Sequence, residues 1–243
     1  EMRTLSRLAA LSRQLNNYFT LYLPYALTSK ETEEKFRDVY TVFAGGDDLF
    51  LIGPWNRMID LADFVTSTFS KYVCHHPSIS ISAGISVTKP GVPVRTMAKL
   101  AEDALDAAKR REGKASVTVF DKTVSWTDWK PLSEVRRRLQ DWLRDGLIND
   151  AMLYRLNEIT DMAEQERLLL EARREIELGE MDCLRWRSAL KYSVARNAAG
   201  GMRGTDKDAK RRAVDEVLSV VEWLETYRGA LRIPLWQVIY DRR

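Results

Sequence analysis

The feature that most constrains the fold of this chain is the run Gly45-Gly46-Asp47-Asp48, which lies between two apolar segments. Residues Val39 to Phe43 are rich in β-forming side chains, and Leu49 to Ile52 form a second short apolar run. Glycine and aspartate suit tight turns, because glycine accepts positive φ angles and aspartate bonds to the nearby backbone. The pattern therefore predicts a β-hairpin that carries these four residues at its tip.

The segments around the hairpin predict the order helix, strand, strand, helix, strand, helix, strand. An apolar helix face runs from Leu5 to Tyr22 and is expected to end at Pro24. Later elements are expected as a helix from Met58 to Tyr72, a strand from Ile79 to Val87, a helix from Met97 to Ala108 and a strand at residues 117–120. A ferredoxin-like palm has this order with one more strand at its start. The missing first strand would precede Glu1.

The pattern changes after about Ser125. Residues 126–243 show no alternating strand pattern, and helical periodicity runs through nearly all of them. One helix is expected to open at Pro131, and the glycine-rich stretch from Gly200 to Gly204 is expected to connect two others. We therefore predict an α+β chain with two domains: a ferredoxin-like palm without its first strand at residues 1–125, and an all-α domain at residues 126–243.

Composition sets broad limits on the class of protein. Hydrophobic residues make up 45% of the 243 residues, which is enough for a sizeable core. The net charge of +3 neither favours nor excludes a nucleic-acid partner, since a local basic patch can bind phosphate without moving the total. Only two cysteines occur, far apart, and no long apolar run is present. A cytoplasmic protein without a membrane partner is expected.

The predicted hairpin tip has the residues that phosphoryl transfer needs. Two divalent ions held by carboxylates can stabilise both the attacking and the leaving oxygen. Asp47 and Asp48 supply two carboxylates, and Gly45 and Gly46 leave the backbone open to a triphosphate. Adjacent residues on a strand point to opposite faces, so a third carboxylate is expected from a neighbouring strand before Glu1. An ordinary Gly- and Asp-rich turn is the alternative interpretation.

Four stretches resemble one known family. Residues Tyr40 to Trp55, which contain the Gly45–Asp48 run, resemble the second palm domain of the large polymerase-like subunit of type III CRISPR effector complexes. The stretches Ser6 to Phe19, Ser82 to Ile85 and Ala104 to Lys114 are similar to that palm's first helix, next strand and closing helix with its turn. The tail through Trp236 resembles the family's C-terminal helical domain, more in its III-A than its III-B version.

The resemblance implies a function. The palms of this family bind ATP and, when target RNA pairs with CRISPR RNA, join it into cyclic oligoadenylates, with Mg²⁺ or Mn²⁺ as cofactor. Asp47 and Asp48 would be the catalytic metal ligands, and Gly45 and Gly46 would shape the nucleotide site. Lys109 and Lys114 would be nucleotide-binding phosphate contacts. The partners would be the other subunits of the complex and, through them, the two RNAs.

The sequence also departs from the whole family subunit. The family's nuclease domain, first palm and zinc-binding region have no counterpart in these residues, so DNA cleavage is not assigned to them. The start at Glu1-Met2, directly in a helical pattern, suggests a piece of a longer polypeptide. The chain alone is therefore expected to make no oligoadenylate.

Two other functions stay open at this point. A diguanylate cyclase shares the palm and the hairpin, but would normally carry Glu at position 48 and Phe at position 49, and would lack so large a helical tail. A degenerate palm that serves only as an assembly surface is the second alternative. The basic clusters of the tail, such as Lys210-Arg211-Arg212, are interspersed with acids and read more readily as a mixed-charge surface than as an RNA groove.

Overall fold

The computed structural model describes residues 4–30, 32–46, 48–172, 177–198 and 207–242. The chain divides into two compact units, residues 1–119 and residues 120–243. The first unit holds strands and helices, and beyond Ser125 the described residues form helices only, so the predicted α+β class is confirmed. The assignment of domains to residues 1–125 and 126–243 stays a proposal.

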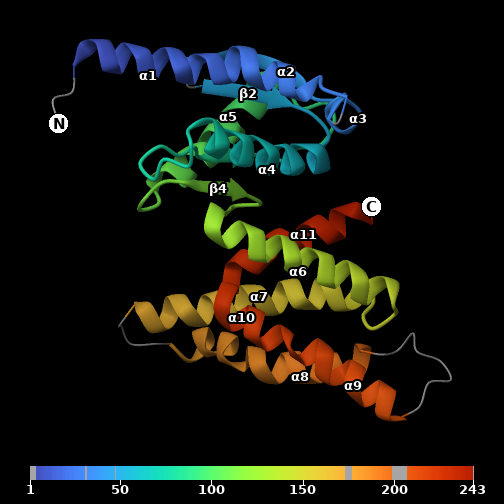
Figure 1. Ribbon diagram of the computed structural model, residues 1–243. Coiled ribbons are helices and arrows are strands. Elements are labelled where there is room, and N and C mark those ends of the chain that lie inside the picture. The colour runs from blue at the N-terminus through green and yellow to red at the C-terminus, as the bar shows by residue number, and fades with distance from the viewer. Residues whose placement is uncertain (1–3, 31, 47, 173–176, 199–206, 243) are drawn as a thin grey trace. The chain divides into compact units, whose positions relative to one another are not determined.

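The first unit opens with one long helical segment (Figure 1). Helix α1 (Leu5–Asn17) begins at Thr4, whose hydroxyl accepts the Arg7 amide. It continues through a π-helical turn, η1 (Tyr18–Tyr22), into α2 (Leu23–Leu27). The predicted stop at Pro24 is wrong, because the π turn lets the Leu23 amide bond to the Tyr18 carbonyl and Pro24 then lies in the first turn of α2, where its missing amide is tolerated.

The core of the first unit is built around Tyr18. Its side chain is fully buried, and its ring meets Phe19 and Phe69 edge-on with centroids 5.0 Å apart in both pairs. The phenol donates to the Val65 carbonyl oxygen at 2.9 Å. Burial raises the pKa of Tyr18 to about 12. The cluster also includes the buried side chains of Leu23, Phe36, Leu61 and Val65.

The predicted hairpin is present. Strand β1 (Tyr40–Gly45) pairs antiparallel with β2 (Asp48–Ile52), and the short helix α3 (Glu33–Phe36) precedes them. The register shifts between Thr41 and Phe43, which marks a β-bulge in β1. Leu49 and Leu51 of β2 pack against the Tyr18 cluster, so the hairpin is held by its second strand.

Two helices and two strands complete the first unit: α4 (Trp55–Tyr72), β3 (Ala83–Ile85), α5 (Val94–Arg110) and β4 (Ser116–Val119). Strand β3 runs parallel to β4, and α5 packs on both. The predicted strand at residues 79–87 is too long, because only Ala83, Gly84 and Ile85 find backbone partners on β4 in the part of the chain that is described. Ile79 and Ile81 instead pack at the edge of the Tyr18 cluster.

The second unit starts with a short strand, β5 (Lys122–Ser125), and is helical afterwards. Its helices are α6 (Trp126–Arg144), α7 (Asp150–Glu171), η2 (Leu178–Arg185), α8 (Trp186–Asn197), α9 (Lys207–Leu218), α10 (Val220–Tyr227), η3 (Arg228–Leu231) and α11 (Arg232–Asp241). Helix α6 starts at Trp126 rather than at Pro131, because the Ser125 hydroxyl caps it by accepting the Asp128 amide at 3.1 Å. The predicted connector at Gly200 to Gly204 lies outside the described residues.

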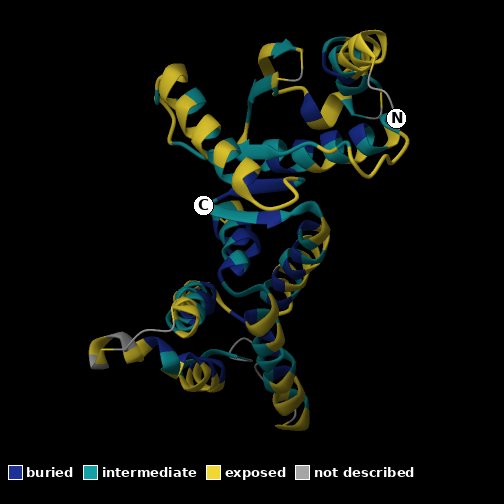
Figure 2. Cartoon of the chain, turned by 90° about the vertical axis from the view of Figure 1, so that its left-hand side faces the viewer, coloured by how far each residue is buried: buried dark blue, intermediate teal, exposed yellow. Residues whose placement is uncertain are grey.

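Tryptophan side chains join the helices of the second unit. The indole N–H of Trp142 donates to Glu216 at 2.8 Å, that of Trp186 to Glu166 at 2.7 Å and that of Trp236 to Asn157 at 2.7 Å. Each bond links two different helices and satisfies a polar atom of a largely apolar ring. Figure 2 shows buried and exposed residues alternating along the helices, the pattern of helices with one apolar side. The core of this unit consists largely of apolar side chains, with buried leucines and tryptophans such as Leu139, Trp142, Leu156, Trp186 and Leu190.

One glycine fixes how closely strand β3 approaches helix α5. A Cβ atom added to Gly84 would lie 2.2 Å from the Leu105 nitrogen and 2.5 Å from the Ala101 carbonyl oxygen. Both neighbours are backbone atoms of a helix, so they cannot rotate away from an added methyl group as a side chain could. We expect Gly84→Ala to lower the free energy of unfolding of the first unit by about 3 kcal/mol or more.

Urea unfolding followed by circular dichroism measures this change. Gly179→Ala is the control, because no atom lies within 4 Å of the methyl group that it adds. Equal unfolding midpoints for the two variants would contradict the close packing of β3 on α5.

Candidate active site at the hairpin tip

The tip of the β1–β2 hairpin brings together three of the predicted site residues. Gly45 pairs with Asp48 across the two strands, and Gly46 begins the connection between them. Asp47 lies outside the described residues. The placement of Gly45, Gly46 and Asp48 at one turn agrees with the sequence-based expectation.

Gly46 has the backbone that the turn requires. Its φ angle is +64°, in the left-handed region that glycine adopts at no steric cost. No atom lies within 4 Å of the position that a Cβ would occupy there. The backbone at Gly46 is therefore open on the side where another residue would carry a side chain.

Asn16 of α1 holds the tip in place. Its side-chain oxygen accepts the Gly46 amide at 3.0 Å, which fixes the turn against the helix. Asn16 is half-buried and directly follows Leu15, which packs against the Tyr18 cluster. Sequence reasoning included Asn16 in a family-like stretch but gave it no role. In the sequence, the position of this polar residue directly after Leu15 in an apolar helix stripe is the one signal for such a contact.

Asp48 is the acidic residue that the structure describes at the tip. It begins β2 and its side chain is exposed. Among the described residues no three His, Cys, Asp or Glu side chains gather into a group that could hold a metal ion. Asp48 thus presents a solvent-accessible carboxylate at the turn.

Lys109 and Lys114 lie on a different part of the first unit. Lys109 is exposed in the last turn of α5, and Lys114 is exposed in the turn that leads into β4, with a φ angle of +52°. Helix α5 packs against β3 and β4 rather than on the tip of the hairpin. Among the described residues no hydrogen bond or ion pair joins either lysine to the hairpin, so their predicted role stays a prediction.

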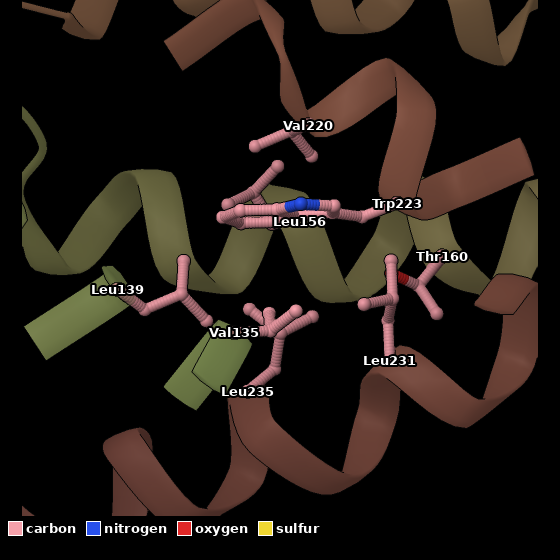
Figure 3. Close-up of a pocket in the computed structure, with 8 residues that line it drawn as sticks. All are labelled: Val135, Leu139, Leu156, Thr160, Val220, Trp223, Leu231 and Leu235. Atoms are coloured by element: carbon pink, nitrogen blue, oxygen red, sulfur yellow. The ribbon is translucent and has the colours of Figure 1, made fainter. Parts of the chain in front are cut away.

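Two cavities lie in the described part of the second unit. One cavity of about 10 Å³ is lined mainly by apolar side chains, and Thr160 is the lining residue that carries a hydroxyl group (Figure 3). A shallower depression of about 180 Å³ lies beside Asp150 and Tyr154, where Arg242 pairs with Asp150. Neither contains a predicted site residue.

Comparison with known proteins shows what the first unit is similar to. Residues 1–118 match the family model described as Cas10/Cmr2, second palm domain. Residues 1–118 are thus similar to the second palm domain of the Cas10/Cmr2 family. The predicted resemblance of the chain to the large polymerase-like subunit of type III complexes is confirmed.

Two curated relatives extend the comparison. A Cas10/Csm1 single-strand-specific deoxyribonuclease of subtype III-A from Methanocaldococcus jannaschii is 33% identical over 140 residues, which cover 51% of this chain and 18% of the relative. The corresponding protein of Mycobacterium tuberculosis is 28% identical over 185 residues, covering 71% of this chain and 22% of the relative. The chain thus spans about a fifth of the length of these relatives.

Solved structures show the same fold. A Csm1–Csm4 cassette in complex with cA4 superposes with a TM-score of 0.60 at 20% identity, over 96% of this chain and 33% of the solved chain. A Csm1–Csm4 cassette in complex with cA3 gives a TM-score of 0.52 at 20% identity, over 89% of this chain and 32% of the solved chain.

The described residues contain no helix that is long and apolar enough to span a membrane.

The hydrogen bond from Gly46 to Asn16 leads to a local prediction. Asn16→Ala removes the acceptor for the Gly46 amide, which costs about 1 kcal/mol for a hydrogen bond of this kind. We expect the Gly46 amide to exchange with solvent roughly fivefold faster, measured by hydrogen exchange with NMR detection.

Asn17→Ala is the matched control, because Asn17 is the half-buried neighbour on the same helix and makes no side-chain capping bond. Equal Gly46 exchange rates in the two variants would mean that Asn16 does not hold the turn.

Proposed function

We propose that this chain forms the GGDD palm and the helical part of a type III CRISPR effector subunit that uses ATP for nucleotidyl transfer and makes cyclic oligoadenylate. The observation that carries the proposal is the hairpin tip, where an open glycine backbone and an exposed Asp48 carboxylate stand together in a second palm domain. The cA4 and cA3 complexes of the related Csm1–Csm4 cassettes support the same class of product.

Asp48 and Asp47 are the proposed catalytic metal ligands. Asp48 has the chemistry for this role, since Mg²⁺ prefers carboxylate oxygens and keeps part of its water shell, so few protein ligands suffice. A bound Mg²⁺ or Mn²⁺ would neutralise charge on the phosphate under attack and on the leaving pyrophosphate. The proposed role of the two aspartates is to hold the positive charge of the metal ion at the turn.

The glycines and lysines have separate proposed tasks. Gly45 and Gly46 are proposed to let a triphosphate approach the backbone of the turn. No atom lies within 4 Å of the Cβ position of Gly46, whereas the Phe43 ring lies 3.3 Å from that of Gly45. Lys109 and Lys114 are proposed to contact phosphate as mobile point charges at the end of α5 and in the turn that follows it. A hydroxyl of one nucleotide then attacks the α-phosphate of an ATP, and pyrophosphate leaves.

The proposed partners follow from the family. A Csm4-type subunit is the natural neighbour, because the solved relatives are Csm1–Csm4 cassettes. CRISPR RNA and target RNA would act through the assembled complex, and the proposed location is the cytoplasm. Because the chain spans about a fifth of the curated relatives, we expect residues 1–243 alone to make no product.

The two alternatives differ from this proposal in testable ways. A diguanylate cyclase would use GTP rather than ATP, and the match to the Cas10/Cmr2 second palm argues against it. A degenerate palm would assemble with its partners without needing Asp47 or Asp48. Substitution of the two aspartates therefore separates an active palm from an assembly module.

The double variant Asp47→Asn with Asp48→Asn, made in the intact subunit within its complex, tests the proposed function. We expect oligoadenylate synthesis to fall by about 100-fold or more, because metal ligation needs charge that the amide lacks. Complex assembly is expected to stay intact, since an exposed turn accepts the isosteric amide. Thin-layer chromatography of products from labelled ATP gives the rate, and gel filtration reports assembly.

Asp103→Asn with Asp106→Asn is the matched control, because it removes two exposed carboxylates from α5 of the same unit. Undiminished synthesis by the Asp47 and Asp48 double variant would contradict the catalytic role of the tip. It would favour the alternative in which the palm serves only as an assembly module.

Lys109→Ala tests the phosphate contact. We expect the KM for ATP to rise roughly tenfold, the effect of losing one hydrogen bond to a charged group, while the thermal midpoint stays unchanged. Lys99→Ala is the control on the same helix, since Lys99 is 65% exposed and pairs with Asp103 at 3.1 Å. Equal KM values for the two variants would mean that Lys109 is an ordinary surface cation that does not contact ATP.

A further inference from the structure

The helices of the second unit divide their basic residues into two groups. In the first group each guanidinium lies close to a carboxylate of another helix or of its own helix. Arg136 pairs with Asp241 at 2.9 Å, Arg138 with Glu216 at 3.0 Å and Arg187 with Glu166 at 3.0 Å. These residues hold the helices together, and their charge is neutralised where they stand.

The second group has no such partner among the described residues. Six of its members lie exposed on α8 and α9, and we call them the α8–α9 basic surface: Lys191, Arg196, Lys207, Lys210, Arg211 and Arg212. In the part of the chain that the structure describes, no ion pair is formed by any of them, although the same helices supply the paired residues Arg187 and Glu216. From Lys191 to Arg212 the sequence holds seven Lys or Arg residues and two Asp, whereas the whole chain carries a net charge of only +3.

The two helices that carry this surface pack against each other (Figure 1). On α8 the buried side is formed by Trp186, Leu190 and Val194, and the exposed side includes Lys191 and Arg196. On α9 the buried side is formed by Ala213 and Val217, which leaves the cations of its first turns in solvent. Apolar packing therefore forces this excess of positive charge outward.

An aromatic ring lies within the basic surface. Tyr192 is 64% exposed, and its hydroxyl accepts a hydrogen bond from Arg196 Nη1 at 2.8 Å. The ring therefore stands beside a guanidinium in solvent instead of in the core. Cations that meet phosphates, next to a flat ring on which a base can stack, are the chemistry by which proteins hold single strands.

We propose that the α8–α9 basic surface binds single-stranded RNA. The charge fits any polyanion, but the exposed Tyr192 ring favours a partner with unpaired bases over an acidic protein or a duplex. A 12-residue helix such as α8 is about 18 Å long, enough for a short single-strand site of about four nucleotides. The choice of RNA rests on the proposed function, in which the complex is guided by RNA.

Fluorescence anisotropy with a labelled single-stranded RNA of about 20 nucleotides tests the charge contribution on the 243-residue chain. The test variant carries Lys191→Gln, Lys210→Gln and Arg211→Gln. The matched control carries Arg137→Gln, Arg144→Gln and Arg155→Gln, three exposed arginines that pair with acids of their own helices. Both variants lose three positive charges.

We expect the test variant to bind the RNA at least roughly tenfold more weakly than the control. Its slope of log affinity against log salt is expected to fall by about 2, because each lost phosphate contact on a single strand contributes about 0.7. Circular dichroism melting of both variants checks that the helices remain folded. Equal loss of affinity in the two variants would reduce the effect to net charge and overturn the proposal.

The stacking contribution has its own pair of variants. Tyr192→Ala is expected to weaken RNA binding about fivefold or more, whereas Tyr154→Ala, which removes a 49% exposed tyrosine from α7, is expected to leave it unchanged. Equal effects of the two substitutions would overturn the assignment of Tyr192.

Competitors decide the identity of the partner. Unlabelled single-stranded RNA is expected to displace the probe, and poly-glutamate of equal charge is not. Displacement by poly-glutamate at equal charge would indicate an acidic protein partner and overturn the proposal. A single-stranded DNA that bound as tightly and depended on the same residues would reassign the surface to DNA and overturn the RNA assignment.

This experiment contains no ATP and does not involve the hairpin tip. Loss of oligoadenylate synthesis and loss of RNA binding can therefore be told apart. A failure of the Asp47 and Asp48 test would leave the anisotropy result standing as a measure of the α8–α9 basic surface alone.

Discussion

Burial of Tyr18 is the interaction on which the first unit depends. The phenol is fully buried, and its hydroxyl forms hydrogen bonds with the Val65 carbonyl and the Thr68 hydroxyl of α4. A buried hydroxyl without partners would be costly, so these bonds fix the rotation of the α1–α2 segment against α4. That rotation also sets the position of Asn16, two residues earlier, whose side chain holds the Gly46 amide.

The geometry of the tip follows from this arrangement. The hairpin is anchored on one side by Leu49 and Leu51 in the Tyr18 cluster and at its end by Asn16. The turn itself is left in solvent, with an open backbone at Gly46 and an exposed carboxylate at Asp48. A rigid support under an exposed polar turn is the arrangement that a catalytic site requires, because the ligands must hold their positions while the substrate enters.

The second unit is organised by polar groups that bridge helices. Trp142 and Trp186 are buried and Trp236 is half-buried, and the indole N–H of each donates to an acceptor of another helix. Glu164 shows the same behaviour: its carboxylate bonds to Arg167 and accepts the Gly229 amide, and the Arg167 hydrogen bond lowers the pKa of Glu164. In the part of the chain that the structure describes, the cations of the α8–α9 basic surface form no such ion pair.

The sequence by itself determined the hairpin, the order of elements and the helical character of the tail. These follow from local patterns, because the run from Gly45 to Asp48 and the apolar periodicities act over a few residues. The ends of elements were less secure: Pro24 does not stop the first helix, Pro131 does not open α6, and the strand near Gly84 is shorter than its alternation suggests. Those limits depend on a π turn, a serine cap and the reach of a neighbouring strand.

Only the tertiary structure decided the roles of Asn16 and of the basic residues in the tail. Asn16 meets Gly46 across 30 positions of sequence, a contact that no local pattern encodes. Likewise, Arg138 and Arg211 look alike in the sequence, yet Arg138 is paired with Glu216 and Arg211 lies exposed on the α8–α9 basic surface. The physical reason is that charge pairing depends on which helices pack side by side, and that is fixed by the fold rather than by neighbours in the chain.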